Sequence, residues 1–144
     1  MIGWLLRLSD AARHQARKRR WSASQAAGRR GEDLAHRYLE RHGMTVVARN
    51  WRTPMGHGEI DLVAWEAGTL VFVEVKARTT DEFGAPERNV DSTKRAALER
   101  AARHYARRAG VSWDRVRFDL VSIVFDDPPS LAHEKDAFQL NRTL

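Results

Sequence analysis

The stretch LVFVEVKAR, residues 70–78, has the composition of a buried β-strand but carries charges near its end. Side chains along a strand point alternately to its two faces. One face is uniformly apolar and consists of Val71, Val73 and Val75. The other face presents Glu74 and Lys76 together, beside Phe72. A carboxylate and an ammonium therefore project from one side of a strand that belongs in a protein core.

The segments around this strand predict an α/β fold. Residues 59–66, EIDLVAWE, predict a second strand, and the short AGT link predicts that it forms an antiparallel hairpin with residues 70–78. Further strands are expected at 44–52 and 116–125, with helices from Ser24 to Gly43 and from Asp91 or Ser92 to about Ala109.

The end of the chain adds no confident strand. The residues after 125 predict a turn marked by proline, then a short segment that packs Ala137 and Phe138 against the sheet. The expected order is α-β-β-β-α-β, an α/β sandwich with strands of mixed direction.

The second expected strand contributes further acids. By alternation, Glu59 and Asp61 share one face, and Ile60 and Leu62 share the other. Because a hairpin places its two strands side by side, we expect Asp61 near Glu74 despite a separation of thirteen residues. Spacing alone does not decide between Glu59 and Asp61 as the functional acid.

Two neighbouring buried carboxylates favour a metal site. Burying them costs roughly several kcal/mol each unless another charge compensates. Mg²⁺ is a usual compensation, since it binds one or two carboxylates together with water and substrate phosphate. Lys76 would then face a metal-bound water or the attacked phosphate, an arrangement that suits phosphodiester hydrolysis. The structural alternative is a Glu-Lys pair on a half-exposed edge strand, with Asp61 nearby by chance.

Glu32 lies at the border of the apolar stripe of the first expected helix, about 20° from Leu39 around the helix axis. A glutamate there can reach toward the sheet without entering the core. It is either a further ligand for metal or water, or an ordinary surface residue, and the residues alone favour the second reading.

Composition bounds the class of protein. The 144 residues fit one domain, and the absence of cysteine excludes disulfides and thiolate metal sites. The apolar runs are too short to span a bilayer and no secretory signal is evident, so we expect a cytoplasmic protein without a membrane partner.

The positive charge is concentrated at the start of the chain. Residues 1–30 carry eight Lys and Arg and one Asp, a net charge of +7, whereas the remainder has 17 basic and 18 acidic residues. The basic segment either contacts nucleic-acid phosphates or is a solvated extension.

Three blocks carry a family resemblance: GRRGE at 28–32, GEIDLVA at 58–64 and FVEVKAR at 72–78. In order and spacing they resemble the YraN family of predicted endonucleases, which is similar to archaeal Holliday junction resolvases. The resemblance runs from about Gly28 to about Phe138. It implies a restriction-endonuclease-like core, that is, a mixed β-sheet flanked by helices. We therefore expect a basic N-terminal extension of residues 1–27 and a nuclease-like domain of residues 28–144.

The resemblance also implies the site. The catalytic set falls on Glu32, Asp61, Glu74 and Lys76. Asp61, Glu74 and the backbone carbonyl of Val75 would bind Mg²⁺ or Mn²⁺, with Glu32 as a candidate further ligand. Lys76 would position or activate the attacking water. The resemblance favours Asp61 over Glu59 and raises Glu32 from surface residue to site residue.

Basic residues outside this set are candidates for nucleic-acid binding: Lys94, Arg95, Arg29, Arg30 and His57. Lys94 opens the second expected helix on the same face as Leu98, where it could extend the site or contact phosphate, since a helix N-terminus favours anions. The alternative for Lys94 is a solvated lysine, and for Arg95 a solvated run of charges on the helix. The alternative for His57 is an incidental loop histidine.

The first hypothesis is a Mg²⁺-dependent or Mn²⁺-dependent endonuclease acting on DNA, with branched or recombination intermediates as candidate substrates. Resolvase-like enzymes pair two sites, so a homodimer is expected by analogy. The alternatives are a non-cleaving nucleic-acid-binding module and a scaffold on the same fold. Alanine at Glu74 separates them, because only an enzyme would lose cleavage while it retains DNA binding.

Overall fold

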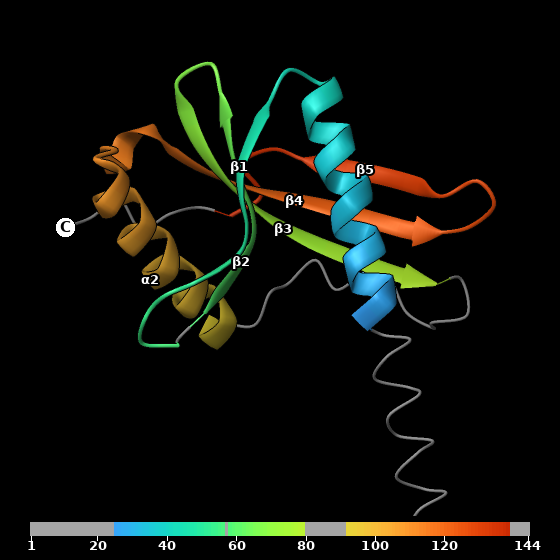
Figure 1. The fold of residues 1–144 in the computed structure, drawn as a ribbon, viewed down its shortest axis with the longest axis horizontal. Helices are drawn as coiled ribbons and strands as arrows, with labels where there is room; N and C mark the ends of the chain where they lie inside the picture. Colours follow the sequence, from blue (N-terminus) through green and yellow to red (C-terminus); the bar gives the residue numbers. More distant parts are fainter. Residues whose placement is uncertain (1–24, 57, 80–91, 139–144) are drawn as a thin grey trace, which may run out of the picture.

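The strands of the protein form one mixed sheet. A computed structural model describes residues 25–56, 58–79 and 92–138. The sheet has five strands in the order β1-β2-β3-β4-β5 (Figure 1). They are β1 (Thr45–Arg52), β2 (Glu59–Glu66), β3 (Thr69–Thr79), β4 (Val116–Phe125) and β5 (Ser130–Glu134). β2 is antiparallel to β1 and β3, β3 is parallel to β4, and β5 is antiparallel to β4.

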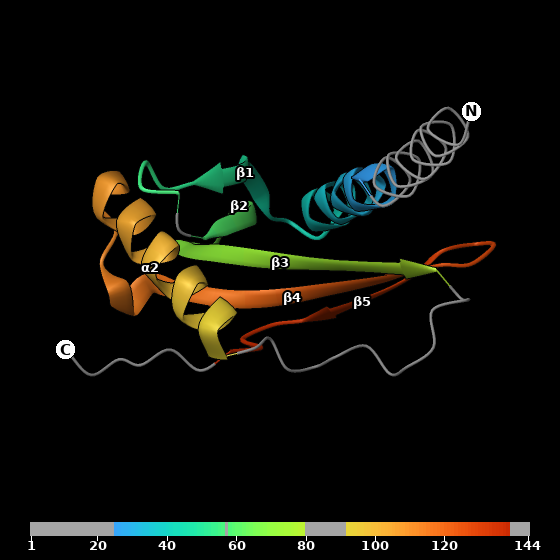
Figure 2. The ribbon, with the colours of Figure 1, turned by 90° about the horizontal axis from the view of Figure 1, so that it is seen from below.

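Helices cover both faces of this sheet. The first helix comprises residues 25–41, and α2 comprises Ser92–Ala109. Ala35 and Leu39 of the first helix pack into the core of one face, whereas Leu98 of α2 packs into the core of the other. Figure 2 shows the two helices toward opposite ends of β3. α2 also supplies the crossover that the parallel pair β3 and β4 requires. The predicted α/β class is confirmed, and the arrangement is consistent with a restriction-endonuclease-like core.

The hairpin between β2 and β3 is also confirmed. Its turn consists of Ala67 and Gly68, with φ of 46° and 85°. Two-residue hairpin turns with positive φ at both positions are of type I′, which matches the twist of the flanking strands. This turn sets the register from Glu66↔Thr69 to Leu62↔Val73.

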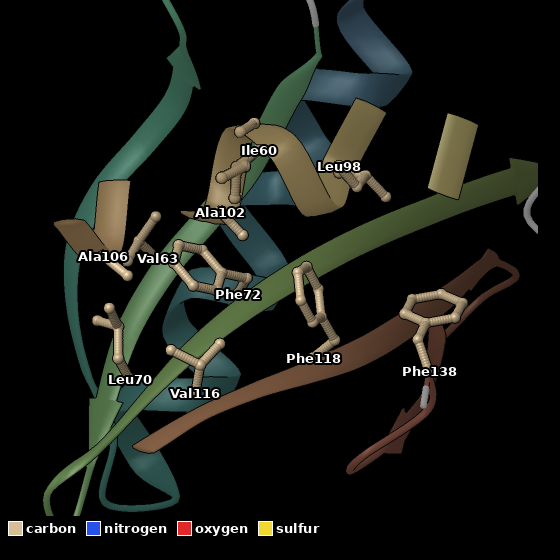
Figure 3. Packing of buried hydrophobic residues seen from close by; sticks show 11 residues of the cluster. Ile60, Val63, Leu70, Phe72, Leu98, Ala102, Ala106, Val116, Phe118 and Phe138 are labelled. Atoms are coloured by element: carbon tan, nitrogen blue, oxygen red, sulfur yellow. The ribbon is translucent and has the colours of Figure 1, made fainter. Parts of the chain in front are cut away.

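β3 is the centre of two cores. Figure 3 shows the aromatic core on the α2 face, where the Phe72 ring lies 5.4 Å from that of Phe118 between ring centroids. The opposite face holds an aliphatic core that includes Val71 and Val73. The predicted division of β3 into two faces is therefore correct, and burial on both sides holds this strand rigidly in place.

Two short elements were not predicted. β5 pairs with β4 at the edge of the sheet, and the 3₁₀ helix η1 (Trp113–Arg115) precedes β4. β5 has only five residues and alternates between exposed and half-buried positions, so it lacks the apolar signal of the central strands. The predicted packing of the following segment is confirmed: Phe138 is buried, and the Ala137 N–H donates a 2.9 Å hydrogen bond to the carbonyl of Phe118.

Part of the predictions falls outside the described residues. This applies to residues 1–24 of the basic extension and to His57. The boundary at residue 27 stays a prediction. Within the described ranges, no helix combines the length and the apolar character needed to cross a bilayer.

Candidate functional site

β2 separates from β3 at Asp61, and this separation creates the candidate site. Backbone pairing between the two strands ends at Leu62↔Val73. Beyond it, Oδ2 of Asp61 accepts a 2.8 Å hydrogen bond from the backbone N–H of Val75. The Asp61 side chain thus occupies the position where a strand backbone would continue the ladder.

The same separation makes one prediction wrong. Ile60 and Leu62 do not share a face: Ile60 lies in the core beneath α2, and Leu62 lies in the opposite core. The irregularity extends into β1, where Asn50 has a φ of 50° and lies between Arg49 and Trp51, the residues that pair with Leu62 and Ile60. A left-handed residue interrupts the regular pleat of a strand. β1 and β2 therefore turn together, and the period of two fails at Asp61.

Asp61 and Glu74 lie together, as the hairpin predicts. Burial and the negative charge of Glu74 raise the pKa of Asp61 to about 8, against the hydrogen bond from Val75, which lowers it. The charge of Glu32 and a hydrogen-bonding contact with the Glu74 carboxyl raise this pKa further. Glu74 is itself buried. Carboxyl groups whose ionisation is opposed in this way are typical of functional sites, although structural networks produce the same effect.

Glu32 comes from the first helix and is held by β1. Its Oε2 accepts a 3.0 Å hydrogen bond from Nδ2 of Asn50 and lies 3.6 Å from Nη2 of Arg49. Gly31 brings this part of the helix onto β3, since a Cβ at position 31 would lie 2.7 Å from the Cβ of Ala77. The absence of a side chain at residue 31 therefore allows Glu32 to approach Asp61.

Lys94 is the cation that contacts the acid pair. Its Nζ lies 3.0 Å from Oε1 of Glu74. α2 reaches this position because Gly58, with a φ of 87°, packs directly against its backbone: a Cβ on Gly58 would lie 2.5 Å from the carbonyl oxygen of Ala97. Lys94 thus lies against Glu74, and both predicted roles, as an extension of the site and as a phosphate contact, stay predictions.

Lys76 lies on β3 two residues after Glu74, and the role predicted for it stays a prediction. It is half-buried on β3, paired in register with Ser122 of β4. In the described part of the chain, its ammonium forms no ion pair with Glu74. The ammonium that neutralises Glu74 in the absence of a ligand therefore belongs to α2 and not to β3.

Among the described residues, the candidates Arg29, Arg30 and Arg95 form no ion pair with the acids of the site. The guanidinium of Arg30 lies 4.9 Å from the ring centroid of Phe125, and that of Arg95 lies 5.3 Å from the ring centroid of Phe138. Arg29 is exposed on the first helix. These three side chains are available on the surface, and their binding to nucleic acid stays a prediction.

A hard divalent cation suits the donors that are present. Across the described ranges, no three or more His, Asp or Glu side chains form a group that could hold a metal ion. The carboxyl groups of Asp61 and Glu74 are in hydrogen-bonding contact. Mg²⁺ is commonly bound by one or two carboxylates, with water and substrate oxygens completing its octahedron. The pair therefore fits such an ion without a further protein carboxylate.

A second buried acid, Asp119, is saturated by its neighbours. Its oxygens accept hydrogen bonds from Arg117 at 2.8 and 3.0 Å, from His133 at 2.8 Å and from the N–H of Asp136 at 3.1 Å. Burial raises the pKa of Asp119, but these hydrogen bonds outweigh it and the net pKa is lowered. With every oxygen occupied, the Asp119 cluster joins β4 to β5 as a structural element.

Sequence reasoning missed the role of Asn50 and the partner of Lys94. The available signal for Asn50 was an asparagine, a residue that tolerates left-handed conformation, inside the strand TVVARNWR. The ion pair of Lys94 with Glu74 joins residues twenty positions apart on different elements, and no local pattern indicates it.

Comparison with known proteins gives a consistent assignment. The family model described as Uncharacterised protein family UPF0102 matches residues 31–123, which include all four predicted catalytic positions. A UPF0102 protein of Solibacter usitatus is 52% identical over 138 residues, covering 96% of this chain and 100% of that protein. A UPF0102 protein of Koribacter versatilis is 47% identical over 79% of this chain and 80% of its own length, and one of Rhodococcus jostii is 44% identical over 78% and 96%. The chain therefore belongs to the UPF0102 family, the YraN family that its sequence blocks resemble.

Proposed function

We propose that this protein is a metal-dependent endonuclease that hydrolyses phosphodiester bonds in DNA, with branched or recombination intermediates as its substrates. The observation that carries the proposal is the contact between the half-buried carboxyl of Asp61 and the buried carboxyl of Glu74, at the point where β2 separates from β3. Two ionised carboxylates this close are unfavourable without compensation, and the raised pKa of Asp61 reflects that cost. A bound divalent cation would neutralise both.

The two carboxylates would hold Mg²⁺ or Mn²⁺ together with the backbone carbonyl of Val75. When bound, such an ion lowers the pKa of a coordinated water and neutralises the charge that develops during phosphodiester hydrolysis. β3 is buried on both faces on the N-terminal side of Glu74, which keeps this side chain in a fixed position.

Lys76 and Glu32 would position the reactants. Lys76 follows Glu74 by two residues on the same strand, so its ammonium would orient the attacking water or bind the scissile phosphate. One oxygen of Glu32 is engaged by Asn50. Its other oxygen would orient the water or bind a second ion.

The DNA backbone would meet basic side chains around the site. The candidates are Lys94, Arg95, Arg29, Arg30 and His57. Contacts of this kind supply affinity without sequence specificity and weaken steeply with salt. DNA as substrate agrees with a cytoplasmic location, and pairing of two sites in a homodimer would allow cuts in both strands of a junction.

A cleavage panel tests the proposal. Duplex, single-stranded, flap and four-way-junction DNA are incubated with Mg²⁺ or Mn²⁺ and with the wild type, Glu74→Gln or Glu59→Gln. Glu59 is the matched control, since it lies on β2 two residues before Asp61 and pairs with the exposed Arg52 at 3.0 Å. We expect Glu74→Gln to abolish cleavage and to retain DNA binding, and Glu59→Gln to cleave as the wild type does. Cleavage that survives in Glu74→Gln contradicts the proposed site.

The same panel distinguishes the rival functions. DNA binding by the wild type without cleavage of any substrate would favour a non-cleaving binding module. Neither binding nor cleavage would favour a scaffold.

A further inference from the structure

The ion pair of Lys94 and Glu74 is unequal in its surroundings. The side chain of Glu74 is only 8% exposed, whereas that of Lys94 is 53% exposed. The carboxylate is thus fixed in the protein, and the ammonium reaches it from solvent on a flexible stem. Such a lysine can leave the site without any movement of the backbone.

The protein contains a second lysine pair that lacks the features of this site. Lys135 lies 3.0 Å from Glu66, and its side chain is 55% exposed, close to the value for Lys94. Glu66, however, is also bound by Arg117 at 3.0 Å, and within the described ranges no second carboxyl group adjoins it. Glu74 instead adjoins Asp61, and among the described residues Lys94 is the cation paired with Glu74. The site around Glu74 therefore offers a second carboxyl group to a bound cation, and the one around Glu66 does not.

We propose that the ammonium of Lys94 is the resident cation of the metal-free site, and that a divalent ion displaces it from Glu74. This inference rests on the proposed function. A cation bound to Asp61 and Glu74 would lie within a few ångströms of the ammonium, where like charges repel strongly. Lys94 yields because it is exposed and readily rehydrated, whereas the two carboxylates are held by the sheet. In the metal-free site, the ammonium of Lys94 stabilises the carboxylate of Glu74.

Calorimetric titration with MnCl₂ at low salt tests the displacement on the full chain. Removal of the competing charge in Lys94→Met should tighten Mn²⁺ binding about three- to tenfold, the range expected when a partly exposed ion pair no longer has to be broken. Lys135→Met should bind Mn²⁺ as the wild type does. Lys94→Arg keeps the charge and should stay near the wild-type affinity.

Thermal unfolding provides a second readout. Without metal, both Lys94→Met and Lys135→Met should melt below the wild type, since each loses an ion pair. Saturating Mn²⁺ should raise the melting temperature of Lys94→Met to that of the wild type, because Lys94 no longer pairs with Glu74 once the metal is bound. The melting temperature of Lys135→Met should stay below the wild-type value.

The outcomes separate the inference from the function on which it rests. If Mn²⁺ binds the wild type and is lost in Glu74→Gln, but Lys94→Met binds it equally or more weakly, the displacement is wrong and the metal site stands. If the wild type binds no Mn²⁺, or binds it independently of Glu74, the proposed function fails and the displacement fails with it.

Discussion

Replacing Gly31 with alanine tests whether the first helix must touch β3 to place Glu32. An added Cβ would lie 2.7 Å from the Cβ of Ala77, whereas ordinary contacts begin at 3.4 Å. The Cβ of Ala77 is fixed directly to the backbone of β3, which is packed in the sheet. No side-chain rotation can therefore relieve the contact. The helix would have to move outward and carry Glu32 with it.

Gly28 is a matched control in the same helix, because a Cβ there would meet nothing within 4 Å. Through helix propensity, each substitution by alanine should increase the free energy of unfolding by at most about 1 kcal/mol. Only Gly31→Ala also carries the cost of overpacking, about 1–3 kcal/mol. The difference between the two variants isolates that cost, so Gly28→Ala should be about 1–3 kcal/mol more stable than Gly31→Ala.

Urea denaturation followed by circular dichroism measures this difference. In the cleavage assay, Gly31→Ala should be slower than Gly28→Ala, since Glu32 has moved. Equal stability of the two variants would refute the close contact. Equal cleavage with unequal stability would refute the role of the contact in placing Glu32.

Three further predictions concern other parts of the molecule. Asn50→Gly keeps a left-handed backbone but removes the amide that binds Glu32, so it should slow cleavage with little change in urea denaturation; an unchanged rate would contradict a positioning role. Phe72→Ala should lower the free energy of unfolding by about 3–5 kcal/mol, because it empties the centre of the aromatic core; a loss in urea denaturation below about 1 kcal/mol would be incompatible with that packing. The lowered pKa of Asp119 predicts sensitivity to acid. Its carboxylate contributes stability that is complete above the ordinary value of 3.8 and is lost as the pH falls toward the lowered folded-state value. Below about pH 4 the wild type should therefore lose stability more steeply than Asp119→Asn, and parallel curves against pH would argue against this contribution.

The central sheet could be predicted because its strands are buried on both faces. β2 (Glu59–Glu66) and β4 (Val116–Phe125) begin and end at the expected residues, since apolar runs and turn residues delimit them. The predicted hairpin was sufficient to place Asp61 near Glu74. β5 was missed because an edge strand with alternating exposure carries little apolar signal.

The finer geometry of the site could not be predicted, because it depends on departures from regular structure. Alternation of side chains assumes a continuous ladder, and the left-handed Asn50 breaks that assumption opposite Asp61. The identity of the neutralising lysine depends on how α2 packs, which a close approach between Gly58 and Ala97 decides. The ion pair of Lys94 with Glu74 was missed because a strand pattern carries no information about a residue that approaches from a helix.

The hydrogen bond from the Val75 amide to Asp61 makes the site observable at a single proton. Most amides of a sheet report on a neighbouring carbonyl, whereas this amide reports on a carboxylate. Its NMR chemical shift will respond when that carboxylate gains a proton or a cation, even if the rest of the sheet is unchanged. Isotope-labelled protein therefore carries its own indicator of site occupancy, which needs neither a substrate nor an attached dye.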